Sequence, residues 1–307
     1  MKSLIINLSF SALALAAQKS PHIEPVKVVQ VPGYTEGVVV DREGRVYISL
    51  PYHGAIYRVS GDTAAVWAET SAPNGHKVLR DGTHLVCDGS AHAVLHLDAD
   101  GRVIDTASSE SEGRVLRAPN DLTLDANGGF YFTDPGGSSL ANPIGTVHYV
   151  DRQRHTHLVV GGLAFPNGIV IRPDGRTLLV GESQRNRILS YAVISPGKVG
   201  EMAVFANLPA KGEGQIANEP DGICLDADGN LYVAHYGMGQ VQVLGRDGRL
   251  RHRYPAGNLT TSNVAFGGPR MDQLFITGAL GDEKTTPGAL FRLDLPGIRG
   301  ASTIRAR

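Results

Sequence analysis

The sequence has few cysteines, methionines and tryptophans, and its low cysteine content argues against a disulfide-rich protein. Its 307 residues include only two cysteines, four methionines and one tryptophan. The cysteines, Cys87 and Cys224, lie in two separate apolar runs, so they do not form a disulfide framework. An oxidising compartment would permit a bond between them, but their spacing does not require one. We therefore predict two buried thiols.

An excess of either charge is also missing. Lysine and arginine number 29 against 30 aspartate and glutamate residues, which gives a formal net charge of −1. Only the end of the chain, with Arg299, Arg305 and Arg307, is locally basic. A nucleic acid is therefore not an expected partner. Long apolar patterns with a 3.6-residue period and helix caps are absent beyond the first residues, which argues against a helical protein.

The N-terminus has a pattern of its own. Residues 1–22 read MKSLIINLSFSALALAAQKSPH, with Lys2 before an apolar run from Leu4 to Leu15 and an A-x-A site at residues 14–16. This order is typical of a secretory signal peptide, and the run is too short to span a membrane as a helix. We predict a signal peptide over residues 1–17 and a single domain over 18–307. A secreted or periplasmic location follows, with no membrane partner.

One phrase occurs six times along the rest of the chain. A small polar residue opens it, followed by an apolar run, a turn of the Asp-Gly type and a second apolar run. The openings are 38 to 54 residues apart and fall at Glu36, Asn74, Asn120, Asn167, Asp221 and Asn263. In the first five phrases a glycine comes eight positions after the opening, at Gly44, Gly82, Gly128, Gly175 and Gly229. A period of this length is typical of propeller blades.

Each repeat has room for four strands. In the fourth repeat they are expected at residues 168–171, 177–180, 187–193 and 201–208. The sequence therefore predicts an all-β fold, a six-bladed β-propeller of four-stranded antiparallel blades. The strand Val26–Val31 precedes the first repeat and is expected to complete the last blade beside Ala289–Leu295, so that no long edge stays open.

The openings are the candidate site. The first strand of each propeller blade lines the central channel, so residues just before these strands gather at one channel mouth. Glu36 and Asp221 bring two negative charges there, and the asparagines bring neutral carbonyl oxygens. Such ligands suit a hard divalent ion. Turn formation alone also favours Asn-Gly and Asp-Gly pairs, so the openings could be repeated turns. Glu36, a poor turn residue, and Asn120, which is followed by Asp121 rather than glycine, favour a metal site instead.

The phrases TEGVVVD, APNDLTLDANGGFYFTDP, FPNGIVIRPDGRTLLVGES, EPDGICLDADGNLYVAHYGMGQV and TSNVAFGG resemble the senescence marker protein/gluconolactonase family of six-bladed propeller lactonases. The likeness runs from about Glu36 to Leu293. Residues 128–193 and 219–244 look most like bacterial gluconolactonases and the staphylococcal drug-responsive lactonase.

This resemblance implies an enzyme with one catalytic divalent cation, Ca²⁺ foremost and Mg²⁺, Mn²⁺ or Zn²⁺ as alternatives. Its implied ligands are Glu36, Asn167, Asp221 and Asn120. Asn120 and Asn74 are implied to bind substrate. Asp121 matches an acid that helps to hold a second, structural ion in some members, and Asn263 has a supporting role.

The implied reaction is hydrolysis of a lactone, first of all a sugar lactone such as gluconolactone. A lactone is a cyclic ester, so the cation would polarise its carbonyl while Asp221 acts as general base; activation of water directly by the metal is the alternative. Two other functions stay open, a phosphotriesterase-type hydrolase on the same metal site and a non-catalytic ligand-binding propeller. Besides the lactone substrate no partner is expected, and the protein would be a monomer or a weak homo-oligomer.

Other candidates carry less. His53, His76 and His235 are interpreted as structural histidines rather than substrate contacts. Ser183 misses the G-x-S-x-G motif because Arg185 takes the last glycine position. Asp134 is interpreted as a structural acid or a contact at the rim. Substrate choice is expected to depend on the loops Tyr52–Ala55, Gly136–Ile144 and Lys211–Asn218.

Overall fold

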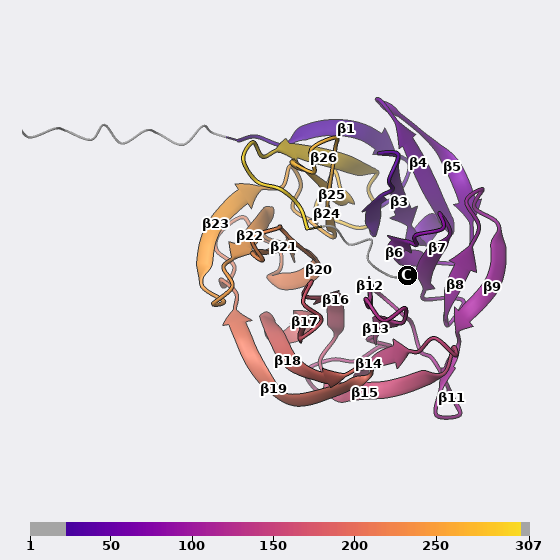
Figure 1. The fold of residues 1–307 in the computed structure, drawn as a ribbon. Coiled ribbons are helices and arrows are strands. Elements are labelled where there is room, and N and C mark those ends of the chain that lie inside the picture. The colour runs from indigo at the N-terminus through magenta and orange to yellow at the C-terminus, as the bar shows by residue number, and fades with distance from the viewer. Residues whose placement is uncertain (1–22, 302–307) are drawn as a thin grey trace, which may run out of the picture.

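The computed structural model describes residues 23–301, and the predicted signal peptide lies outside this part of the chain. The described residues form six four-stranded antiparallel sheets around a central channel, as Figure 1 shows. Their helical elements are two short 3₁₀ turns, η1 (Pro51–His53) and η2 (Ser183–Arg185). Nothing in residues 23–301 is a helix with the length and apolar character needed to cross a membrane. The predicted six-bladed propeller is confirmed.

The blades follow the repeats in order. Blade 1 comprises β2 (Val38–Val40), β3 (Val46–Leu50), β4 (Ala55–Ser60) and β5 (Thr63–Glu69). Blade 2 comprises β6 (Pro73–Val78), β7 (His84–Asp88), β8 (Ala93–Leu97) and β9 (Val103–Ser108). Blade 3 comprises β12 (Leu122–Leu124), β13 (Phe130–Asp134), β14 (Gly145–Val150) and β15 (Thr156–Leu163). Between blades 2 and 3 lies a small hairpin of β10 (Glu110–Ser111) and β11 (Arg114–Val115).

Blade 4 comprises β16 (Pro166–Ile171), β17 (Thr177–Glu182), β18 (Arg187–Ser195) and β19 (Lys198–Asn207). Blade 5 comprises β20 (Glu219–Leu225), β21 (Leu231–Tyr236), β22 (Gln240–Leu244) and β23 (Leu250–Pro255). Blade 6 joins the two ends of the described chain. It has the strand order β1-β26-β25-β24, with β24 (Val264–Gly267), β25 (Gln273–Ala279) and β26 (Gly288–Asp294) from the end and β1 (Val26–Val31) from the start.

The pairing of β1 with β26 closes the ring. The two strands are antiparallel, with Gln30 opposite Ala289 and Val31 opposite Gly288, and in Figure 1 the indigo strand lies beside the yellow one. Val29 and Val31 are buried in the apolar cluster that joins blade 6 to blade 1. The predicted closure by Val26–Val31 is confirmed.

The repeated glycines turn the first hairpin of five blades. Each donates its N–H to the carbonyl three residues earlier, as Gly128 does to Asp125 at 3.0 Å and Gly175 to Arg172 at 2.8 Å. All five have a positive φ, from 71° to 87°, a conformation that side chains with a Cβ rarely adopt. The eight-residue spacing in the sequence is therefore a backbone requirement of these turns.

The core is divided among the blade interfaces. The described residues contain six apolar clusters, one between each pair of neighbouring blades. Cys87 lies in the cluster between blades 2 and 3, and Cys224 in the one between blades 5 and 6. Both are buried free thiols, as predicted. Each blade buries its faces only against its two neighbours, so the ring is the cooperative unit.

A histidine pair lies in the interface between blades 1 and 2. The ring nitrogens His76 Nε2 and His84 Nδ1 are 2.7 Å apart, and both residues are buried beside Tyr47 and Trp67. Burial lowers the pKa of both imidazoles, that of His84 to about 4. Two neutral imidazoles can share one N–H between these nitrogens, whereas a protonated ring would be desolvated.

This pair should make the fold sensitive to acid. Because the folded-state pKa of His84 lies below its unfolded value of 6.5, stability is complete above pH 6.5 and falls as pH drops toward 4. We expect His84 alone to cost about 1 kcal/mol of unfolding free energy by about pH 5.5. Urea unfolding of the wild type and His84→Gln at about pH 7.5 and pH 5.5 measures this loss.

The variant should lose about 1 kcal/mol less than the wild type over that range. His155→Gln, which removes an exposed imidazole, should behave as the wild type. Equal losses in all three proteins would contradict the assignment.

Candidate metal centre

The six openings gather at one end of the central channel. The innermost strands β2, β6, β12, β16, β20 and β24 contact one another in sequence around the ring, and β24 returns to β2. Asn74, Asn167 and Asp221 lie within the first residues of β6, β16 and β20, whereas Glu36 and Asn120 come two residues before β2 and β12. Asn263 directly precedes β24. All six therefore stand at the same mouth.

Glycines bring neighbouring openings into contact. A Cβ added to Gly37 would lie 2.1 Å from the carbonyl oxygen of Asn74, and one added to Gly168 would lie 2.2 Å from that of Asp221. A Cβ on Gly222 would lie 2.4 Å from Cγ of Asn263. Real Cβ atoms do not approach so closely, so the mouth has this width because these positions carry no side chain.

Acidic residues at the ends of second strands fix the segments that lead into the mouth. The carboxylate of Asp134, at the end of β13, accepts the backbone N–H groups of Arg117 at 2.8 Å and Ala118 at 2.7 Å. Asp88 does the same for Ser71 and Ala72 in blade 2. Asp134 is therefore the structural acid that the sequence indicated. These bonds position the chain two or three residues before Asn74 and Asn120.

Two carboxylates are buried at the mouth. Glu36 is 5% exposed and Asp221 is 6% exposed. Burial raises the pKa of Glu36 to about 7, although Lys284 and the Tyr34 hydroxyl oppose the shift. Burial also raises the pKa of Asp221 well above its usual value, and the negative charge of Glu36 adds to this effect. The two side chains are thus close enough to repel each other.

One oxygen of Glu36 lacks a partner. Tyr34 donates its hydroxyl to Oε1 of Glu36 at 3.2 Å, but Oε2 is buried and has no hydrogen-bond donor. An unpartnered buried carboxylate oxygen is costly. A cation between Glu36 and Asp221 would bind this oxygen and remove the repulsion, so the residues fit a bound metal.

The available ligands favour a hard ion. Asn167 is buried, and Asn74 and Asn120 are half-buried, so amide oxygens flank the two carboxylates. Within residues 23–301 no group of three or more histidine, cysteine, aspartate or glutamate side chains could hold a metal. Two carboxylates with neutral oxygen donors are ligands for Ca²⁺, Mg²⁺ or Mn²⁺ rather than for a thiolate or imidazole site. The roles of the individual ligands remain predictions.

Asn263 and Asp121 have protein partners instead. Oδ1 of Asn263 accepts the N–H of Val264 at 2.9 Å, in keeping with a supporting role. The carboxylate of Asp121 accepts the N–H of Leu122 at 2.8 Å and lies 3.6 Å from the ammonium of Lys77. The family resemblance had implied that Asp121 matches an acid that helps to hold a second, structural ion. In this chain a lysine supplies the positive charge at Asp121.

Below the mouth the channel is mostly apolar. A cavity of about 850 Å³ extends along the inner strands and reaches the opposite end of the propeller. One residue from each inner strand lines it near the mouth, in order Val38, Lys77, Thr123, Ile169, Ile223 and Val264. Lys77, the ion-pair partner of Asp121, is thus the charged residue of this row.

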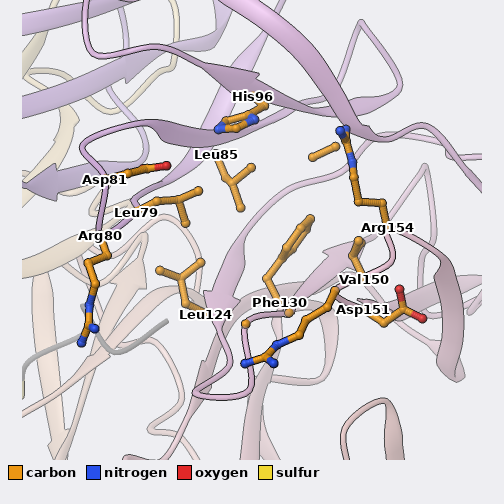
Figure 2. A pocket seen from close by; sticks show the side chains of 14 residues that line it. Leu79, Arg80, Asp81, Leu85, His96, Leu124, Phe130, Val150, Asp151 and Arg154 are labelled. Atoms are coloured by element: carbon orange, nitrogen blue, oxygen red, sulfur yellow. The ribbon is translucent and has the colours of Figure 1, made fainter. Parts of the chain in front are cut away.

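A second cavity lies away from the mouth. It has a volume of about 420 Å³ and lies between blades 2 and 3, at the hairpin turns of the opposite end. Figure 2 shows its apolar lining of Leu85, Leu124 and Phe130 with charged side chains around the edge. None of the six openings lines it, so it is not the predicted metal site.

Several sequence candidates are occupied structurally. His76 belongs to the pair described above, and His235 Nε2 lies 2.9 Å from Oδ1 of Asn186. Both are structural histidines, as predicted, whereas His53 is exposed on η1. The buried hydroxyl of Ser183 donates to the carbonyl of Pro220 at 2.6 Å, so it is not placed as a nucleophile.

Three residues at the mouth were missed by the sequence reasoning. Tyr34 and Tyr236 flank the carboxylates, and the ammonium of Lys284 lies 5.1 Å and 4.9 Å from their ring centroids. Lys284 comes from the loop between β25 and β26. Desolvation lowers its pKa, but Glu36 and Asp221 outweigh this and raise it. The available signal was topological, because every loop between a second and a third strand returns to the mouth.

The fold is a six-bladed propeller with an oxygen-rich mouth at one end of its channel. Residues 30–280 match the SMP-30/Gluconolactonase/LRE-like region, so the chain belongs to this family. Diisopropyl-fluorophosphatase of Loligo vulgaris is 29% identical over 290 residues, 84% of this chain and 90% of that protein. Lactonase drp35 of Staphylococcus aureus is 30% identical over 237 residues, 73% of this chain and 68% of that protein. The expected family is confirmed, and with it the expectation of an enzyme.

Solved structures are similar in fold. A gluconolactonase of Xanthomonas campestris superposes with a TM-score of 0.76 at 24% identity, covering 89% of this chain and 90% of that one. Regucalcin of Agrobacterium tumefaciens, a calcium-binding protein, gives a TM-score of 0.73 at 19% identity, covering 92% of this chain and 100% of that one. At these identities the likeness extends to the propeller architecture.

If the mouth binds a divalent ion, the ion should stabilise the fold. We expect Ca²⁺ at about a hundred times its dissociation constant to raise the unfolding free energy of chelated protein by about 3 kcal/mol. Glu36→Gln should lose this response and, without metal, be at least as stable as the wild type because a desolvated charge is gone. Thermal unfolding with and without Ca²⁺ tests both points.

The matched control is Glu43→Gln, which changes an exposed glutamate in the first hairpin turn. It should respond to Ca²⁺ as the wild type does. An undiminished response of Glu36→Gln would show that the ion binds elsewhere.

Proposed function

We propose that the protein is a metal-dependent lactonase, with sugar lactones such as gluconolactone as its first substrate class. The observation that carries this is the unpartnered buried oxygen of Glu36 beside the carboxylate of Asp221. Family membership and the lactonase among the relatives support the reaction type. Glu36, Asn167, Asp221 and Asn120 would hold the cation, with Ca²⁺ as the first choice.

The chain's own residues can carry out the remaining chemistry. When bound, the divalent cation would polarise the ester carbonyl as a Lewis acid. The carboxylate of Asp221 accepts a proton from the attacking water. The water oxygen bonds to the carbonyl carbon, the ring C–O bond breaks, and the proton passes to the released alkoxide, giving a hydroxy acid. Asn74 and Asn120 offer neutral amides that hydrogen-bond sugar hydroxyls without adding charge.

Phosphotriester hydrolysis is the second candidate. The similarity to diisopropyl-fluorophosphatase covers 84% of this chain, and the same kind of ion and water would serve attack at phosphorus. A binding propeller without turnover is the non-enzymatic alternative. We also propose export of the protein, in keeping with the N-terminal pattern, and action as a monomer or weak homo-oligomer.

Lactone hydrolysis should depend on both the ion and Asp221. Chelated protein should have no activity above background, Ca²⁺, Mg²⁺, Mn²⁺ or Zn²⁺ should restore it to different degrees, and Asp221→Asn should lower kcat at least about a hundredfold. Proton release from gluconolactone, followed by a pH indicator, measures each rate. Circular dichroism checks that the variant is folded.

Asp228→Asn is the control, because this exposed aspartate lies at the far end of the same β20–β21 hairpin. It should keep wild-type turnover. Turnover that survives chelation, or that Asp221→Asn leaves unchanged, would overturn the mechanism. Turnover of diisopropyl fluorophosphate without any lactone activity would favour the second candidate.

A further inference from the structure

A short loop of blade 6 presents a lysine to the mouth. Residues 280–287 join β25 to β26, and the loop is closed by the bond from the N–H of Leu280 to the carbonyl of Pro287 at 2.8 Å. The Thr286 hydroxyl donates to the carbonyl of Glu283 at 2.8 Å and accepts the N–H of Gly281 at 3.1 Å. These bonds within the loop hold Lys284 at its centre.

The ammonium of Lys284 lies over two tyrosines that adjoin the carboxylates. Its Nζ is 5.1 Å from the ring centroid of Tyr34 and 4.9 Å from that of Tyr236. Tyr34 donates its hydroxyl to Glu36, and Tyr236 ends the second strand of the blade whose first strand carries Asp221. The lysine therefore stands beside both carboxylates, although the residue itself is exposed at the surface.

Lys284 is not bonded to these carboxylates directly. Among the described residues, no ion pair within 4.0 Å links its Nζ to Glu36 or Asp221. Aromatic rings attract an ammonium but do not take the place of hydrogen-bond acceptors for its three N–H groups. Lys284 can thus donate to a further group at the mouth.

The charges indicate what that group is. Two carboxylates balance one divalent ion, and among residues 23–301 no carboxylate lies within 4.0 Å of the Lys284 ammonium. Asp282 and Glu283 precede it in the loop but are exposed, and Glu283 accepts the hydroxyl of Thr285 at 3.1 Å. Glu219 also faces this region, but its carboxylate lies toward Gln184 on blade 4. Beside Tyr34, Tyr52 is 65% exposed, and its ring centroid lies 6.0 Å from that of Tyr34. The mouth therefore offers an aromatic surface and one cation to the ligand.

We propose that Lys284 is a specificity-determining residue that selects lactones bearing a carboxylate, such as the lactones of sugar diacids. The lactone ring binds over the oxygen-rich mouth, and the carboxylate accepts charge-assisted hydrogen bonds from the ammonium. This inference rests on the proposed lactonase function. Removal of such a bond costs about tenfold or more in binding.

A matched pair of substrates tests the proposal. D-glucaro-1,4-lactone and D-glucono-1,4-lactone differ by a carboxylate in place of a hydroxymethyl group. The wild type should have the higher kcat/KM for the glucaro-lactone. Lys284→Met should raise KM for that substrate about tenfold and change KM for the glucono-lactone less than about twofold. Lys284→Arg should keep most of the preference, and added salt should reduce it.

The control is Lys198→Met, which removes an exposed ammonium from the outer strand β19 and should preserve both constants. A binding measurement without turnover uses two lactams, pyroglutamate and 5-hydroxymethyl-2-pyrrolidinone. Ligand-observed NMR should detect stronger binding of pyroglutamate to Ca²⁺-loaded wild type than to Lys284→Met. If no lactone is hydrolysed, the proposed function fails, and the lactam pair still tests the recognition of the carboxylate.

Two results would overturn the proposal. One is an equal loss for both lactones in Lys284→Met, which would make the lysine a general support of the mouth. The other is a Lys284→Met variant whose Ca²⁺ affinity, measured by calorimetry, is altered while the ratio of kcat/KM for the two lactones stays unchanged. In that case Lys284 serves only as a counter-charge for Glu36 and Asp221.

Discussion

The pairing of the first strand with the last blade is the constraint on which the rest of this protein depends. Each of the six apolar clusters lies between two blades, so no blade has a complete core by itself. The pairing of β1 with β26 completes the sheet of blade 6 with a strand from the other end of the described chain, and Val29 and Val31 of β1 join the cluster between blades 6 and 1. Stability is therefore distributed around the ring rather than concentrated in one core.

The same closure concentrates charge. Glu36 and Asp221 come from blades 1 and 5, yet they influence each other's ionisation at the mouth. Backbone contacts between neighbouring openings hold them there, and Asp88 and Asp134 fix two of the segments that lead in. The stability of the blade interfaces thus holds two buried carboxylates close together at the mouth.

The sequence was sufficient for the architecture because its opening residues recur in all six blades and its turn glycines in five of them. Strand ends were less predictable: residues 201–208 were expected as the outer strand of blade 4, whereas β19 spans Lys198–Asn207, since pairing with β18 and its bulges sets the limits. Lys284 was not predicted because it lies outside the repeated phrases, and Tyr236 was not predicted because it follows the second apolar run rather than opening a phrase. The role of Lys77 was not predicted, because the sequence of an apolar strand does not indicate that its ammonium pairs with Asp121 on the next blade.

The glycines beside the openings have a consequence for the coordination distance. They contribute no ligand, yet the missing Cβ at Gly37, Gly168 and Gly222 lets adjacent backbones touch. Even an alanine at one of these positions would push two blades apart and enlarge the aperture. Ca²⁺ bonds to oxygen at about 2.3–2.6 Å and Mg²⁺ at about 2.0–2.1 Å, so a few tenths of an ångström separate their requirements. If the mouth holds the proposed ion, these three glycines help to decide which ion fits.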